Sequence, residues 1–181
     1  MDAFSPRDAK VEMMAHEWYK ANLPKHSKKL EVIHFNDVYN LEEHTDGGPI
    51  IAGCARFVSA LDKYGSKDKL VLFSGDFFFP SNLSTFFNGK QMLKPFERMN
   101  VDASCLGNHE LEIGMDHGIE LIKQTSCPWL MSNLIALDND SKPIAECEAF
   151  TVVEAQGFKI GVMGFAEEAW LDQLPPCINV K

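Results

Sequence analysis

Residues 101–110 read Val-Asp-Ala-Ser-Cys-Leu-Gly-Asn-His-Glu, a mostly apolar run that ends in a glycine and three polar residues. The run 101–106 has the length and composition of a buried β-strand. The glycine that follows lets the backbone turn sharply and present the next side chains at the strand end. In parallel α/β sheets this end of a strand is where ligands bind.

Three other segments end in the same way. Residues 30–36 predict a strand followed by Asp37, residues 70–74 a strand followed by Gly75 and Asp76, and residues 129–132 a strand followed by Asn133. Between the strands, apolar residues recur at helical spacing in residues 50–64, 91–99 and 115–125. This alternation predicts an α/β fold with a mostly parallel sheet of βαβ units, covered by helices.

The two ends of the chain differ from this pattern. Residues 1–29 predict an amphipathic helix with a basic linker, which packs on its own domain or docks on a partner. Residues 30–181 then form the second unit, the α/β domain itself. Near its end, residues 150–154 and 158–165 predict a hairpin, and residues 167–174 a short helix.

Composition excludes several classes of protein. With 181 residues the chain has room for one domain with a real core, and its net charge of −9 argues against nucleic acid as a partner. Five cysteines without a Cys-x-x-Cys pair indicate neither a zinc ribbon nor a disulfide framework. No stretch has the length of a signal peptide or of a membrane span, so we expect a cytoplasmic protein with no membrane partner.

The strand ends carry residues suited to metal chemistry. Successive strands deliver Asp37, Asp76 and the pair Asn108-His109 to one edge of the predicted sheet. Hard oxygen ligands beside an imidazole suit a pair of divalent metal ions, and such a pair suits attack of water on a phosphate ester. The conjunction is more informative than any one residue, because a lone aspartate at a strand end is usually a turn former or helix cap.

These motifs are similar to those of a known superfamily. Asn36-Asp37, Ser74-Gly75-Asp76, Gly107-Asn108-His109-Glu110 and Ser132-Asn133 resemble the successive motifs of the calcineurin-like metallophosphoesterases. Gly47-Gly48 followed by Arg56, with Ser132-Asn133-Leu134, resembles the 5′-nucleotidase and UDP-sugar hydrolase branch. The resemblance covers about residues 30–175 and implies the first part of a four-layer αββα sandwich.

The resemblance also implies roles for individual residues. Asp37 would bind the first metal ion, Asp76 would bridge both ions, and Asn108 would bind the second. His109 would stabilise the transferring phosphoryl group or protonate the leaving oxygen. The cofactors would be two divalent ions, with Mn, Zn, Mg, Fe and Ca not distinguished. The substrate would be a small phosphorylated molecule, most simply a nucleotide.

Three departures from the family pattern shape these expectations. The family places Asp-x-His in its first motif, whereas this chain has Tyr39, so Tyr39 or His44 is the candidate substitute ligand. An aspartate that orients the histidine is replaced by Glu112, which is one methylene longer and can still reach His109. The family's later histidine ligands do not occur before Lys181, so we expect weak metal occupancy in residues 1–181.

Two functions therefore stay open. The first is metal-dependent hydrolysis of phosphate esters, with an incomplete site in residues 1–181. The alternative is a non-catalytic relative that keeps the scaffold and binds a protein partner. In either case an unfinished sheet or the N-terminal helix predicts self-association or a partner chain.

Overall fold

The apolar runs predicted as strands lie side by side in one parallel sheet. Its order is β1-β4-β5-β6, and each neighbouring pair is parallel. The prediction of a mostly parallel sheet in an α/β fold is confirmed, although each strand is shorter than predicted. The strand bounds are β1 (Val32–Phe35), β4 (Leu70–Phe73), β5 (Ala103–Cys105) and β6 (Trp129–Leu130).

This computed structural model describes most of the chain after the N-terminal segment. The predicted N-terminal helix in residues 1–29 lies almost wholly outside the described part, so its packing stays a prediction. No helix in the described part is both long enough and apolar enough to cross a membrane. The described residues are 28–44, 47, 50–137, 142–175 and 178.

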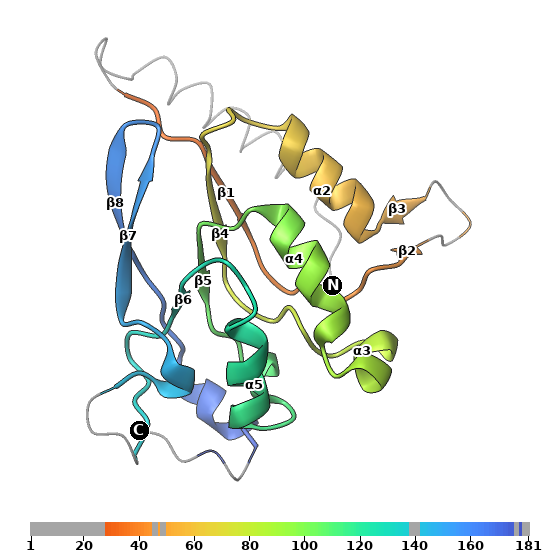
Figure 1. Ribbon diagram of the computed structural model, residues 1–181, viewed down its shortest axis with the longest axis vertical. Helices are drawn as coiled ribbons and strands as arrows, with labels where there is room; N and C mark the ends of the chain where they lie inside the picture. The colour runs from red at the N-terminus through yellow and green to blue at the C-terminus, as the bar shows by residue number, and fades with distance from the viewer. Residues whose placement is uncertain (1–27, 45–46, 48–49, 138–141, 176–177, 179–181) are drawn as a thin grey trace, which may run out of the picture.

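Helices cover one side of the sheet and a hairpin lies on the other (Figure 1). The helices on the covered side are α2 (Cys54–Lys63), α4 (Leu93–Met99) and α5 (Met115–Ile122). Each turns apolar side chains to the sheet, among them Leu61, Phe96 and Leu121, all of which are buried. The helical spacing read from the sequence therefore reports the buried face correctly.

Helix boundaries differ from the prediction. The helix predicted from residue 50 begins at Cys54, because Gly53 takes a φ of 89° that no right-handed helix contains. The residues before it form β3 (Ile51–Ala52), which pairs antiparallel with β2 (Glu43–His44). The predicted helix 91–99 is a 3₁₀ turn, η1 (Lys90–Met92), followed by α4. The helix predicted for 115–125 ends at Ile122.

Short helical turns account for the remaining differences. The sequence analysis missed α3 (Asn82–Phe87), a six-residue helix whose first turn is closed by a capping box between Ser81 and Ser84. The helix predicted for 167–174 is a 3₁₀ helix, η4 (Glu168–Gln173). Two further 3₁₀ turns are η2 (His109–Leu111) and η3 (Ile144–Glu146).

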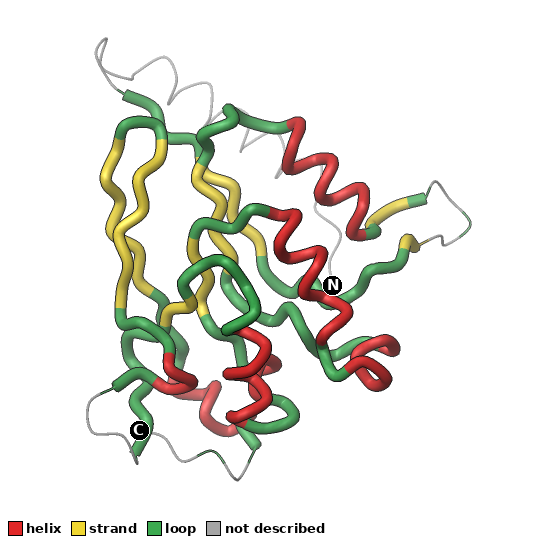
Figure 2. The backbone as a smooth tube through the Cα atoms, viewed as in Figure 1, coloured by secondary structure: helices red, strands yellow, loops and turns green. Residues whose placement is uncertain are grey.

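The predicted hairpin is confirmed. β7 (Phe150–Ala155) and β8 (Phe158–Met163) pair antiparallel around a two-residue turn in which Gln156 and Gly157 both have positive φ (Figure 2). Side chains alternate between a half-buried inner face and an exposed outer face. Phe150, Val152 and Met163 lie on the exposed face.

Aromatic rings fill the space between the sheet and the helices. Phe73, Phe78 and Phe96 contact Trp129, whose ring stacks on Phe96 with centroids 5.6 Å apart. Phe77 packs against these three phenylalanines. The Trp129 indole N–H is satisfied by Thr125 at 2.8 Å. The run Phe77–Phe79 is therefore part of the core and offers no exposed platform for a base.

Phe96 provides a test of this core. Its side chain is 1% exposed, so we expect Phe96→Ala to lower the free energy of unfolding by about 3–5 kcal/mol. Phe86 on α3 is 81% exposed and serves as the matched control, with an expected change within about 0.5 kcal/mol for Phe86→Ala. Urea unfolding followed by tryptophan fluorescence measures both variants. Equal losses would contradict the described packing.

Candidate active site

The loops after β1 and β4 carry Asp37 and Asp76 at equivalent positions. Both aspartates have a left-handed backbone conformation, with φ of 56° at Asp37 and 65° at Asp76. Backbone hydrogen bonds join the two loops beyond the strands, since the Asp37 N–H donates to the Gly75 carbonyl and the Val38 N–H to the Asp76 carbonyl, both at 3.1 Å. Left-handed backbone at a residue other than glycine is strained and collects at functional sites. The two carboxylates thus start from adjacent strand ends.

The loop after β5 touches the loop after β4. A Cβ placed on Gly75 would lie 2.6 Å from the Gly107 Cα, so neither loop tolerates a side chain at this crossing. The His109 backbone N–H donates to Asp76 Oδ1 at 3.1 Å. Asp76 and the pair Asn108-His109 are therefore in direct contact, as their strand-end positions predict.

Asn108 has a partner that the sequence analysis missed. The Trp170 indole N–H donates to Asn108 Oδ1 at 3.1 Å, from the 3₁₀ helix η4 more than sixty residues further along the chain. The bond holds the amide plane and leaves one lone pair of the oxygen for another partner. No spacing in the sequence points to Trp170, because the contact depends on where η4 packs.

His109 is oriented by Glu112, as predicted. Its Nδ1 lies 3.1 Å from Glu112 Oε2 within the turn that begins at His109. A carboxylate only accepts, so Nδ1 carries the proton and Nε2 is the ring nitrogen left for another group. Both side chains are partly exposed. Their catalytic roles stay a prediction.

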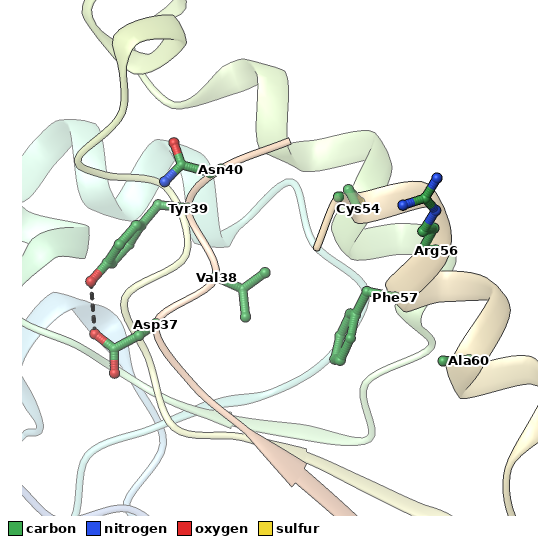
Figure 3. Close-up of a pocket in the computed structure, with 9 residues that line it drawn as sticks. Asp37, Val38, Tyr39, Asn40, Cys54, Arg56, Phe57 and Ala60 are labelled. Atoms are coloured by element: carbon green, nitrogen blue, oxygen red, sulfur yellow. Dashed lines mark hydrogen bonds between the residues drawn. The ribbon is translucent and has the colours of Figure 1, made fainter. Parts of the chain in front are cut away.

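Tyr39 lies beside Asp37 and donates a hydrogen bond to its carboxylate. Its hydroxyl donates to Asp37 Oδ1 at 2.9 Å (Figure 3), and Asn36 donates to the other carboxylate oxygen. Burial, followed by the bond to the Asp37 carboxylate, raises the pKa of Tyr39 to about 12. The phenol is therefore neutral at physiological pH and stabilises the charge on Asp37. Its ring meets His109 edge to face, with centroids 6.0 Å apart.

Two other carboxylates, those of Asp37 and Glu112, lie close enough to Asp76 to affect its pKa. Burial raises the pKa of Asp76, and the nearby carboxylates of Asp37 and Glu112 act in the same direction. The backbone N–H of His109 opposes this shift by bonding to the carboxylate. The charge of His109 also acts against the shift, and a bound cation would lower the electrostatic energy of these partly buried carboxylates further.

The chemistry of the donor set fits a hard divalent cation, but the set is small. Asp37, Asp76 and Asn108 supply two carboxylates and an amide oxygen. Within the described ranges no group of three or more His, Cys, Asp or Glu side chains is placed to hold a metal ion. His44 on β2 completes no such group, and Tyr39 points its proton at Asp37. The described residues therefore supply two carboxylates and one amide oxygen, and a metal site at these residues stays a prediction.

Two cavities flank these residues. One of about 430 Å³ opens between Asp37, Tyr39 and the apolar side chains of Val38 and Phe57 (Figure 3). The other, of about 300 Å³, is lined by Asp76, Asn108 and Trp170 among others. The site therefore has space on both sides of the aspartate pair. Arg56 in the first cavity is held by the Ile50 carbonyl at 2.8 Å and by the Glu43 carboxylate at 3.3 Å.

The motif Ser132-Asn133 is joined by hydrogen bonds to residues 164–166. Asn133 both donates to and accepts from the backbone of Ala166, at 2.6 and 3.0 Å. The Ser132 N–H donates to the Gly164 carbonyl at 2.6 Å. These bonds fix residues 164–166, which lead into η4 and Trp170, and thus support the Asn108 side of the site.

Known proteins with similar sequences are nucleotidases. The chain is 29% identical over 151 residues to a 5′-nucleotidase of Diplobatis ommata, a match covering 77% of this chain and 26% of that protein. It is 28% identical over 155 residues to a probable 5′-nucleotidase of Treponema pallidum, covering 75% of this chain and 25% of that protein. The chain thus spans about a quarter of the length of these relatives. No protein-family model matches it.

Solved structures show the same fold. A 5′-nucleotidase precursor from Thermus thermophilus superposes with a TM-score of 0.70 at 24% identity, over 84% of this chain and 32% of that one. A calcineurin-like phosphoesterase from Bacillus subtilis superposes with a TM-score of 0.63 at 18% identity, over 84% of this chain and 53% of that one. The chain is therefore similar in sequence to 5′-nucleotidases over about three quarters of its length, and it shares the fold of these solved structures.

Proposed function

We propose that this chain carries part of the active site of a metal-dependent phosphoesterase that hydrolyses nucleotides. The observation that carries the proposal is the convergence of Asp37, Asp76, Asn108 and His109 at three adjacent strand ends. The relatives named 5′-nucleotidases support nucleotides as the substrate class. None of the comparisons supports the alternative of a non-catalytic scaffold.

Each residue has a task that its surroundings suit. Asp37, Asp76 and Asn108 would hold the divalent cation through oxygen atoms. A bound cation supplies positive charge that stabilises the charge on phosphoryl oxygens. With Nδ1 bonded to Glu112, His109 presents Nε2 to the substrate; when the ring is protonated on both nitrogens, Nε2–H can donate to a phosphoryl oxygen or give its proton to the leaving oxygen. The identity of the ions and the cytoplasmic location stay predictions.

Hydrolysis assays test the proposal directly. With added Mn²⁺ we expect the chain to release phosphate slowly from AMP and from a generic phosphate ester, because the described donors form an incomplete set. Asp76→Ala should abolish this activity, and so should a chelator. Glu154→Ala, on the far hairpin, is the matched control and should leave the rate unchanged. Activity that survives both Asp76→Ala and chelation would contradict the proposal.

Tyr39 offers a gain-of-function test. Tyr39→His places an imidazole beside Asp37, where it can donate a nitrogen lone pair that the neutral phenol lacks. We expect Mn²⁺ to bind at least about tenfold more tightly, since one added ligand is worth more than about 1.4 kcal/mol. Calorimetric titration with Mn²⁺ measures this, with Tyr39→Phe as the control. An unchanged affinity would show that residue 39 does not face the ion.

The hairpin supports the prediction of self-association or a partner chain. Phe150, Val152 and Met163 share its exposed face, with Phe165 just beyond. Within the described residues β7 and β8 pair only with each other. An apolar face beside unpaired strand edges is a common association surface.

Sedimentation velocity over a range of concentrations tests this association. We expect the mass of the wild type to rise with concentration, because burying this apolar face removes it from water. Val152→Lys should shift the rise to at least about tenfold higher concentration, since association would then bury a charge. Tyr64→Lys, at an exposed site at the end of α2, is the control. Equal effects of both variants would exclude the hairpin face.

A further inference from the structure

Glu110 is a buried acid to which the proposed chemistry assigns no task. Its side chain is 0% exposed, and it is the only charged residue in the buried part of the described chain. Burying a charge is costly unless hydrogen bonds replace the lost water. The contacts that replace the water therefore indicate what Glu110 does.

All of these contacts are backbone N–H groups of the two loops at the site. Oε2 accepts from Asp76 N and from Gly107 N, both at 2.8 Å. Oε1 accepts from Phe77 N at 2.7 Å and from Phe78 N at 3.4 Å. One carboxylate thus joins the loop after β4 to the loop after β5.

The loop after β4 is shaped to receive an anion. Gly75 and Asp76 have φ of 91° and 65°, and the amides of residues 76–78 all point to the Glu110 carboxylate. Successive N–H groups arranged in this way form a nest that binds anions. Because the Glu110 carboxylate fills the nest, these amides are not available to a substrate phosphate.

The hydrogen bonds to Glu110 Oε2 come from a proposed site residue and from the direct neighbour of another. The amide that Glu110 holds is that of Asp76 itself, and Gly107 directly precedes Asn108. A Cβ on Gly107 would lie 2.6 Å from Glu110 Oε2 and 2.4 Å from Asp76 N, so the three groups leave no space between them. Any shift of Glu110 would therefore change the distance between Asp76 and the pair Asn108-His109.

We propose that Glu110 is a positioning residue that sets the spacing between the Asp76 loop and the Asn108-His109 loop. This inference rests on the proposed hydrolytic function, because the spacing matters only if those residues act together. A purely structural role would instead stabilise the whole fold and leave the geometry of the site unaffected at temperatures where the protein is folded.

Glu110→Gln in the full chain tests the proposal. The substituted amide keeps one acceptor and turns an NH₂ group toward N–H donors, so loop bonds are lost while the volume is kept. We expect the amides of Asp76 and Gly107 to exchange hydrogen at least about tenfold faster, with the amide of Leu121 in α5 unchanged. The kcat for AMP should fall about 100-fold with KM nearly constant, since a shift of about 1 Å misplaces the reacting groups.

Two further variants separate positioning from stability. Leu121→Ala removes a fully buried side chain from α5 that makes no hydrogen bond to either loop, so it destabilises the fold through lost packing. It should raise exchange broadly and leave kcat unchanged below its unfolding temperature. Glu110→Asp keeps the charge on a shorter arm and should recover part of the lost kcat. If Glu110→Gln does not fold, the same measurements on Glu110→Asp test the proposal.

The outcomes are distinct. Faster exchange in Glu110→Gln that matches Leu121→Ala across the whole chain would overturn the proposal. Faster exchange confined to the two loops with no change in kcat would overturn it as well. Absence of hydrolysis by the wild-type chain would instead refute the proposed function, while the exchange data would still show whether Glu110 joins the loops.

Discussion

The candidate site depends on a close crossing of two backbone loops around one buried carboxylate. Gly75 and Gly107 approach so closely that neither position has room for a Cβ, and Glu110 bonds to amides on both sides of the crossing. Loss of water raises the pKa of Glu110, and the bonds from Phe77, Asp76 and Gly107 act in the opposite direction. Those bonds offset part of the cost of burial. The loops that carry Asp76, Asn108 and His109 are therefore placed by backbone contacts, which are stiffer than side-chain packing alone.

Much of the fold could be predicted because its signals are local. Apolar strands alternating with amphipathic segments indicated a parallel sheet, and the hairpin followed from two β-rich runs around Gln156 and Gly157. The start of α2 was wrong because apolar spacing continues through residues 50–53, whereas the positive φ of Gly53 ends the helix there. α3 was missed because six residues are too few to show a period. Its capping box, Ser81 with Ser84, was the signal available.

The residues of the site also divide into those with a local sequence signal and those without one. Asp37, Asp76, Asn108 and His109 were predictable, because position at a strand end determines where a side chain emerges in a parallel sheet. The bond between Glu112 and His109 spans three residues and was also predictable. The hydrogen bond from Trp170 to Asn108 spans 62 residues of sequence. The hydrogen bonds from the amides of residues 76–78 to Glu110 span 32–34 residues. Both sets form only when the chain has folded. No local pattern encodes them.

The order of the strands in space follows their order in the chain, β1-β4-β5-β6. Each strand can therefore pair with the free edge of the one before it as soon as it leaves the ribosome, and no strand must insert between two others. Chains are made from the N-terminus, and such sequential growth avoids waiting for distant partners. Asp37 is placed first, Asp76 next and the pair Asn108-His109 third. Trp170 comes last, so the Asn108 amide gains its final bond only after the sheet has formed. The contacts around Asn108 thus join the sheet to a segment that is made after all four strands of that sheet.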